Sequence, residues 1–256
     1  MNTVFRTEQP RDWWNTAALG AVAVIVFLMI WLSACSSPPS SAPQTNNAAT
    51  GNVPAAAPAS AGASKTAGES VPQTLADAGE YGENVYDAAK ANDWKTANAK
   101  LASLKEAARQ VRAGVRNQAA AADRLDANIA ALAGTVLAKD RPAAMREANQ
   151  VTFDVANMTA AYKLSVPVEV TKLDYYGREL ETWAQAKDAN KLQATAREMR
   201  QTWDALRPSI EAKSATEAKK FDALVARVES AKTPADYARV ATPVLDEVDN
   251  LEKLFP

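Results

Sequence analysis

The side chains that most often carry catalysis and metal binding are scarce in this sequence. Among its 256 residues, one is cysteine, Cys35, and none is histidine. The lack of imidazole excludes histidine-ligated haem, histidine-containing zinc and di-iron sites, and Ser-His or Cys-His catalytic pairs. A lone cysteine excludes intrachain disulfides and thiolate metal sites. The sequence also lacks a phosphate-binding loop and a Gly-x-Ser-x-Gly motif. We therefore expect no enzymatic activity, no catalytic residues, no cofactor and no bound metal.

The residues around Cys35 indicate lipid attachment instead. Cys35 follows Leu32, Ser33 and Ala34 at the end of an uninterrupted apolar run, Ala17 to Leu32, and a polar segment precedes that run. This order is typical of a secretory signal peptide. The four residues Leu32-Ser33-Ala34-Cys35 resemble the bacterial lipobox. The resemblance implies that the signal peptidase recognises Leu32, Ser33 and Ala34, that diacylglycerol is attached to the Cys35 sulfur, and that the new amino terminus is acylated, for example with palmitate.

A second interpretation of this segment is an uncleaved transmembrane anchor. The apolar run is close to the roughly 20 residues that span a bilayer, with Trp13 and Trp14 at one interface and Trp31 near the other. Both interpretations place residues 36–256 in the cell envelope, outside the cytoplasm and tethered to a membrane. Because Ser36 follows the cysteine, the lipobox resemblance implies the outer membrane as destination in a bacterium with two membranes.

Composition divides the chain into four segments. Residues 1–34 form the signal peptide or anchor. Residues 35–72 are rich in Ser, Pro and Ala and nearly free of large apolar side chains, so we expect a flexible linker that buries too little surface to fold. Residues 73–164 and 165–256 carry apolar residues at helical spacing, and we expect each to form one helical unit.

The two helical segments match one another along their length. Four apolar stripes recur in order, at shifts of 95, 95, 96 and 92 residues. In the first stripe, the positions Leu75, Ala78, Gly82, Val85 and Ala89 recur as Val170, Leu173, Gly177, Leu180 and Ala184. The sequence therefore predicts an all-α protein with an internal duplication, in which each copy is an up-down-up-down four-helix bundle. Helix starts are indicated at Thr74, Asp93, Asp140, Pro167, Ser214 and Thr233.

This architecture resembles the imelysin-like group of periplasmic proteins, which are built from two helical bundles and are associated with metal or iron uptake. The resemblance covers the fold alone, since the His and Glu signature of that group has no counterpart here. It therefore implies no function for this chain.

A Tyr-Gly pair in the first helix of each unit is the candidate binding site. Tyr81-Gly82 recurs as Tyr176-Gly177, with each glycine on the apolar stripe. A glycine inside a helix costs about 1 kcal/mol relative to alanine, so its recurrence needs a physical reason. One reason is the close approach of a neighbouring helix. The other is a small cleft floored by backbone, with the tyrosines beside it.

Charged residues give two weaker candidates. Asp126 matches Asp222, and Asp154 matches Asp246, so paired carboxylates are ligand candidates for a hard cation. No acidic triplet of calcium-loop spacing accompanies them, and surface ion pairs are the alternative. The second candidate is a basic helix face that either is solvated and paired with residues such as Glu106 or contacts an anionic surface. Its members are Lys105, Arg109, Arg112 and Arg116.

The overall charge balance limits the kinds of partner that the chain is expected to bind. The 29 basic and 30 acidic side chains are spread evenly, which argues against nucleic-acid binding because that needs a clustered basic surface. We expect a membrane-tethered, non-enzymatic interaction or scaffold module that contacts another envelope protein or a wall component. The alternative is a binding module for a small ligand or a cation.

Overall fold

The structure is a computed structural model that describes residues 68–115 and 117–255. Leu32, Ser33, Ala34, Cys35 and Arg116 therefore lie outside the described residues. Within the described ranges, no helix is long and apolar enough to cross a membrane.

The expected all-α class is confirmed. The described part of the chain holds eight helices, and its only β-type pairing is an isolated bridge between Ser70 and Lys163. The helices are α1 (Gln73–Lys90), α2 (Trp94–Gly114), α3 (Ala119–Ala138), α4 (Arg141–Thr159), α5 (Val168–Ala186), α6 (Ala189–Lys213), α7 (Ala215–Ser230) and α8 (Pro234–Glu252).

Most predicted helix starts are confirmed. The side chains of Asp93, Asp140 and Ser214 each accept a hydrogen bond from a backbone N–H in the first turn of α2, α4 and α7. Thr233 and Asp236 form a complete capping box at α8. The predicted cap at Thr74 is wrong. Pro72 occupies the N-cap position of α1, because its fixed φ suits the residue that leads into a helix.

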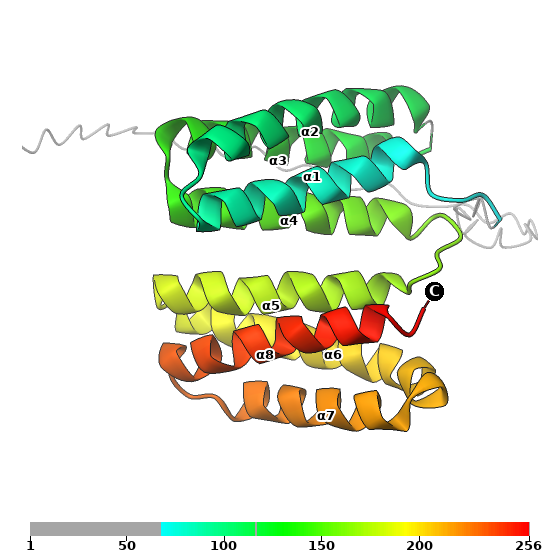
Figure 1. Cartoon of the computed structure of the whole chain (residues 1–256), viewed down its shortest axis with the longest axis vertical. Coiled ribbons are helices and arrows are strands. Elements are labelled where there is room, and N and C mark those ends of the chain that lie inside the picture. The colour runs from blue at the N-terminus through cyan, green and yellow to red at the C-terminus, as the bar shows by residue number, and fades with distance from the viewer. Residues whose placement is uncertain (1–67, 116, 256) are drawn as a thin grey trace, which may run out of the picture. The chain divides into compact units, whose positions relative to one another are not determined.

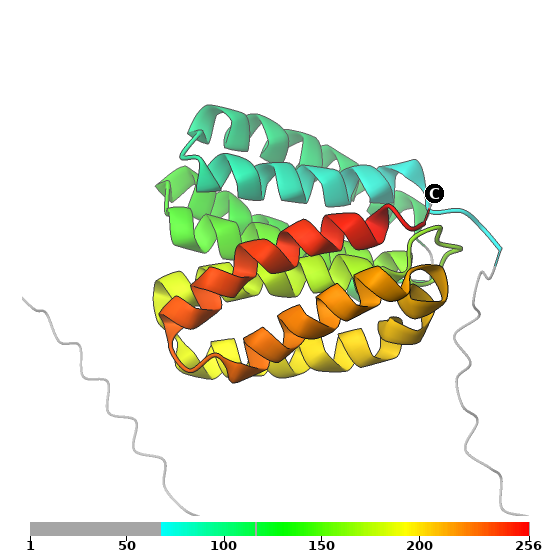
Figure 2. The same ribbon diagram turned by 60° about the horizontal axis from the view of Figure 1, so that its bottom comes forward.

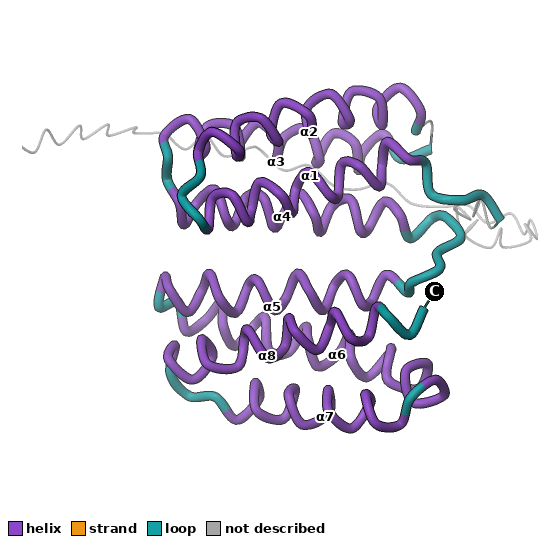
Figure 3. Tube along the Cα trace, in the orientation of Figure 1, coloured by secondary structure: helices purple, strands orange, loops and turns teal. Residues whose placement is uncertain are grey.

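The helices form two groups, each around its own apolar core (Figures 1 and 2). In the first group, α1 packs against α2 and α4, and α3 packs against the same two helices. In the second group, α5 packs against α6 and α8, and α7 closes the ring. The connections within each group are short (Figure 3), which keeps neighbouring helices antiparallel. The two groups meet where α4 packs against α5.

Local backbone geometry repeats between the groups. Pro72 and Pro167 lead into α1 and α5 with nearly identical dihedral angles, φ −58° and ψ 135° against φ −56° and ψ 138°. Asn92 and Lys187 both adopt left-handed conformations, with φ of 57° and 56°. Each of these residue pairs is separated by 95 positions in the sequence, which is the shift of the first apolar stripe.

Candidate functional site

The two glycines of the predicted site lie where helices approach closely. A Cβ atom placed on Gly82 would meet Thr152 Oγ1 at 3.0 Å and Val151 Cγ1 at 3.3 Å, both on α4. A Cβ atom placed on Gly177 would meet Leu245 Cδ2 on α8 at 2.6 Å. At both positions the neighbouring helix occupies the space that a side chain would take.

The two tyrosines of the predicted site have different surroundings, and the structure does not bring them together. Tyr81 lines a surface groove of about 400 Å³ between α1 and α2, which Asp77 and Glu106 also line. Tyr176 is 8% exposed, and its ring centroid lies 5.3 Å from that of Tyr175. Tyr81 thus borders a groove in the first group of helices, whereas Tyr176 is buried in the second, with its ring centroid 6.4 Å from that of Phe153 on α4.

Asp126 and Asp222, the first pair of matched aspartates, form ion pairs with arginines at equivalent positions of the two groups of helices. Arg112 donates to Asp126 at 2.6 Å and to Asp123 at 2.7 Å. In the second group, Arg207 donates to Asp222 at 3.0 Å. Because Arg112 and Arg207 are themselves 95 positions apart, the same ion pair between the second and third helices occurs in both groups.

Asp154 and Asp246, the second pair of matched aspartates, differ in their burial. Asp154 is 8% exposed and accepts a hydrogen bond from Asn128, whereas Asp246 is exposed. Among the described residues, no group of three or more acidic side chains is arranged to hold a metal ion. On the predicted basic face of α2, Arg109 pairs with Glu106 and Arg112 with the two aspartates named above.

A groove that the sequence did not reveal lies between α6, α7 and α8. It consists of two adjoining hollows, of about 300 Å³ and about 170 Å³, that share Gln193, Glu229 and Tyr237 as lining residues. Arg197 and Arg200 line the larger hollow, and Lys232 lines the smaller one. Tyr237 is only 5% exposed, so its ring forms part of the groove wall.

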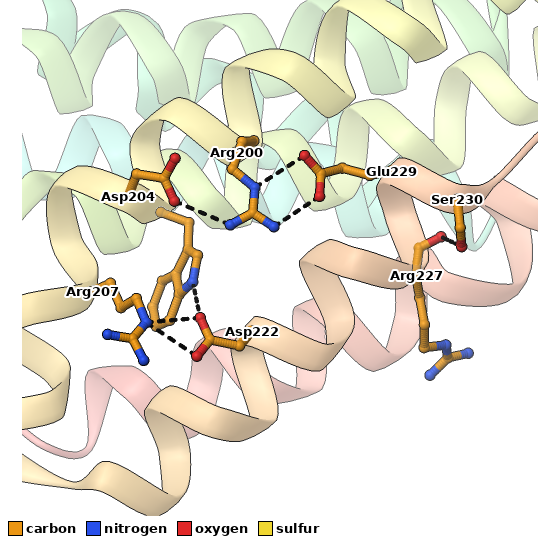
Figure 4. A network of polar contacts seen from close by, with 8 residues as sticks. Arg200, Asp204, Arg207, Asp222, Arg227, Glu229 and Ser230 are labelled. Carbon is orange, nitrogen blue, oxygen red and sulfur yellow. Dashed lines mark hydrogen bonds and ion pairs between the residues drawn. The ribbon is translucent and has the colours of Figure 1, made fainter.

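One cation of the groove is held firmly by its neighbours. Arg200 donates two hydrogen bonds to Glu229, at 3.0 Å from Nε and 2.8 Å from Nη2, and a third to Asp204 at 3.1 Å (Figure 4). Such a two-pronged contact between guanidinium and carboxylate fixes both side chains. The hydrogen bond that Arg200 donates to Glu229 is the main reason that the pKa of Arg200 is raised. Arg200 and Glu229 therefore compensate one another in the wall of the groove.

Three other polar groups at the groove have no such partner. Within the described residues, no hydrogen bond or ion pair engages the guanidinium of Arg197, the ammonium of Lys232 or the hydroxyl of Tyr237. Burial raises the pKa of the Tyr237 hydroxyl, and the nearby Arg197 opposes that rise. Tyr237 therefore remains a neutral hydrogen-bond donor beside an uncompensated positive charge.

The backbone amides at the start of α8 are already engaged. Thr233 Oγ1 accepts a hydrogen bond from the Asp236 N–H, and the Asp236 carboxylate accepts bonds from the N–H groups of Lys232 and Thr233. These hydrogen bonds, that from the Thr233 side chain above all, lower the pKa of Asp236 to about 2. Side chains, rather than helix-terminal amides, are therefore the groups that this groove offers to a ligand.

A second concentration of charge lies where the two groups of helices meet. Arg178 on α5 is 12% exposed at its side chain, and it forms ion pairs with Asp174, at 2.9 Å from its Nε atom, and with Glu83 on α1, at 3.9 Å from its Nη2 atom. Burial is the main reason that the pKa of Glu83 rises to about 7, and Asp174, Glu252 and Asp87 add to the rise while Arg178 opposes it. More carboxylates than cations face this contact. Protonation of Glu83 near neutral pH therefore removes one negative charge and reduces the repulsion at the contact.

Comparison with known proteins leaves the groove to be interpreted from its own residues. No protein-family model and no curated protein matches the sequence, and no solved structure matches the fold.

Proposed function

We propose that this chain is a non-enzymatic binding module of the cell envelope and that the groove between α6, α7 and α8 is its ligand site. The observation that carries the proposal is the unpaired guanidinium of Arg197 beside the nearly buried Tyr237 in that groove. Ligand sites in proteins are concave and combine apolar walls with a few convergent polar groups. Several polar groups converge on the groove, and its larger hollow, of about 300 Å³, lies at the lower end of the size range for small-molecule sites.

The pairing of the nearby charges supports this choice. Arg200 and Arg207 are held by carboxylates on α7, as expected for cations whose role is to join helices. Arg197 lies on the same helix, one turn before Arg200, yet has no carboxylate partner among the described residues. A cation at a groove without a protein partner is available to an external anion or hydrogen-bond acceptor.

We further infer that α1–α4 and α5–α8 are two copies of one four-helix unit. The repeated lead-in prolines, left-handed residues and Arg–Asp ion pairs support this inference beyond the apolar stripes. The positions equivalent to Arg197 and Tyr237 are Ala102 and Met145 in the first copy. On this interpretation, the binding groove is a specialisation of the second copy.

The proposal includes a membrane tether at Cys35. The supporting feature is the Leu32-Ser33-Ala34-Cys35 sequence after an apolar run, and the linker at 35–72 would let the helical part act away from the membrane. The test is the variant Cys35→Ala. A wild-type lipoprotein carries a lipid label and has the mass of the chain that starts at Cys35, and both properties are lost in Cys35→Ala. A wild type that already has full-length mass and no lipid label, and that Cys35→Ala leaves unchanged, would instead support the uncleaved anchor.

The binding proposal is tested by the small molecules that the protein retains. The full chain is extracted gently from native envelopes, and its bound compounds are analysed by mass spectrometry. Gln193 is exposed and lines both hollows, so Gln193→Trp should fill the groove and abolish retention. Asn98→Trp is the matched control, because Asn98 is exposed and occupies the equivalent position in α2.

The outcomes separate the two functions that the sequence predicts. A small molecule that is retained by the wild type and by Asn98→Trp, but not by Gln193→Trp, supports a ligand site in the groove. Recovery of a stoichiometric envelope protein, with no small molecule and with no effect of Gln193→Trp, would favour the scaffold function and contradict the proposal.

A further inference from the structure

We infer that the groove between α6, α7 and α8 takes an elongated organic dianion, with a carboxylate-type group at each end. This inference rests on the proposed function and names the class of ligand.

The first reason is the placement of the uncompensated cations. Arg197 lines the larger hollow and Lys232 the smaller one, and neither has an ion-pair partner among the residues that the structure describes. The remaining charges of the lining, Arg200 and Glu229, neutralise each other through two hydrogen bonds. Each hollow therefore presents one free positive charge, which favours one anionic group in each.

The second reason is the length of the groove. The two hollows adjoin and share Gln193, Glu229 and Tyr237 as lining residues. A compact anion such as phosphate can occupy only one of them, whereas an elongated ligand can reach the free cation of each. An elongated molecule with two anionic ends therefore matches the groove better than a compact anion.

The third reason is the geometry of the donors. The guanidinium of Arg197 can donate two parallel hydrogen bonds to one carboxylate, and the Tyr237 hydroxyl and the Gln193 amide are further donors at the groove. The amides at the start of α8 already donate within the capping box. Anion binding at this groove therefore depends on Arg197 and Lys232 rather than on a helix terminus.

Calorimetric titration of the full chain in mild detergent tests this inference. The probes are linear α,ω-dicarboxylates from succinate to suberate, the monocarboxylates of matching carbon number, and inorganic phosphate. We expect affinity to peak at one dicarboxylate length, since the two charges lie in separate hollows. At that length, the dicarboxylate should bind at least about tenfold more tightly than the matching monocarboxylate, as expected for one additional charged hydrogen bond.

Single-residue variants test which cations of the groove bind the dicarboxylate. Arg197→Gln and Lys232→Gln should each reduce dicarboxylate affinity by about tenfold or more, towards the value for the monocarboxylate. Arg227→Gln is the matched control, because Arg227 lies on α7, forms no ion pair with a described residue and points away from the Arg200–Glu229 pair (Figure 4). Its affinity should equal that of the wild type. Thermal melts confirm that each variant is folded.

The outcomes distinguish failure of the ligand class from failure of the site. If monocarboxylates or phosphate bind as tightly as every dicarboxylate, or if Arg197→Gln leaves affinity unchanged, the dianion inference is wrong. If the dicarboxylates do not bind but a different molecule is retained by the wild type and lost in Gln193→Trp, the groove is the site and only the ligand class is wrong. If no probe binds and nothing is retained, both proposals are wrong.

Discussion

The two groups of helices bury matching positions with side chains of very different size. Trp203 and Phe221 in the second group are fully buried, with ring centroids 4.6 Å apart. The positions that match them in the first group are Ala108 and Leu125. Small residues let α1, α2 and α4 pack closely, whereas α6, α7 and α8 are held around large rings and border the groove. The same helical pattern thus supports one core built around small residues and one built around large rings, and the helices of the second border the groove of Arg197 and Tyr237.

The largest expected effect comes from removing the central ring of the second half. Trp203 is 0% exposed, so Trp203→Ala should lower the free energy of unfolding by about 3–5 kcal/mol, through lost burial and the cavity left behind. Chemical denaturation followed by circular dichroism measures this change. The reciprocal variant Ala108→Trp should overfill the first half and cost about 1–3 kcal/mol. Equal tolerance of both changes would mean that the two cores do not differ in packing.

The matched ion pairs give the next comparison. Asp222 accepts hydrogen bonds from Arg207 and from the indole N–H of Trp203 at 2.8 Å, whereas Asp126 pairs with Arg112 alone and is 44% exposed. Asp222→Ala should cost about 1–2 kcal/mol, because it leaves the Trp203 N–H without a partner. Asp126→Ala should cost less than about 1 kcal/mol, as is usual for exposed pairs. If both variants lost the same free energy of unfolding in denaturation experiments, the indole hydrogen bond would not make Asp222 more important than Asp126.

The two glycines should differ in their tolerance of alanine. At Gly82, the nearest atoms belong to Val151 and Thr152, which are buried and stiff because they branch at Cβ. At Gly177, the nearest atom is the end of the half-buried Leu245 side chain, which can rotate away. Helix propensity favours alanine by about 1 kcal/mol at both sites. We therefore expect Gly177→Ala to be nearly neutral in thermal melts and Gly82→Ala to be destabilising. The reverse order would show that α5 and α8 form the tighter contact.

The contact between the halves should weaken as pH rises. The pKa of Glu83 rises from the usual 4.5 to about 7 in the folded chain, so the folded state binds more protons than the unfolded state between these values. Stability linked to Glu83 is therefore highest below pH 4.5 and is lost as pH rises towards 7. Asp174 and Glu252 have raised pKa values as well and should add to the trend.

Melting temperatures across pH 5 to 8 check this prediction. Glu83→Gln should flatten the dependence, whereas Glu80→Gln, an exposed position on the same helix, should leave it unchanged. The chain contains no histidine, so no imidazole titrates in this range. An unchanged slope in Glu83→Gln would exclude Glu83 as its source.

The sequence predicted much of the fold because helix formation follows local rules. The stripe that includes Leu75 and Val85 is buried, as is its counterpart with Val170 and Leu180. The side-chain caps at Asp93 and Thr233 were also readable, since a cap depends on residues three positions apart. The start of α1 was misplaced because Thr74, two residues after Pro72, is itself of a type that caps helices, whereas no such residue competes with Pro167 at the start of α5.

The candidate site was much less predictable. The Tyr81-Gly82 repeat pointed to helix contacts as readily as to a cleft, and only the three-dimensional structure separates Gly82 from the groove beside Tyr81. The second groove joins Arg197 on α6, Glu229 on α7 and Tyr237 on α8. These residues are distant in sequence and share no spacing rule. The one signal was the presence of Tyr237 and Arg197 where the first half has methionine and alanine.

Photo-cross-linking in intact envelopes tests most directly whether the second half binds a small ligand. A photoreactive benzoylphenylalanine replaces Gln193 at the groove or Asn98 at the equivalent position of the first half, and the mass of each irradiated protein is measured. A ligand site in the second half should give a small-mass adduct at position 193 and none at position 98. A protein-sized adduct at position 193, or the same small adduct at both positions, would contradict a ligand site in the second half.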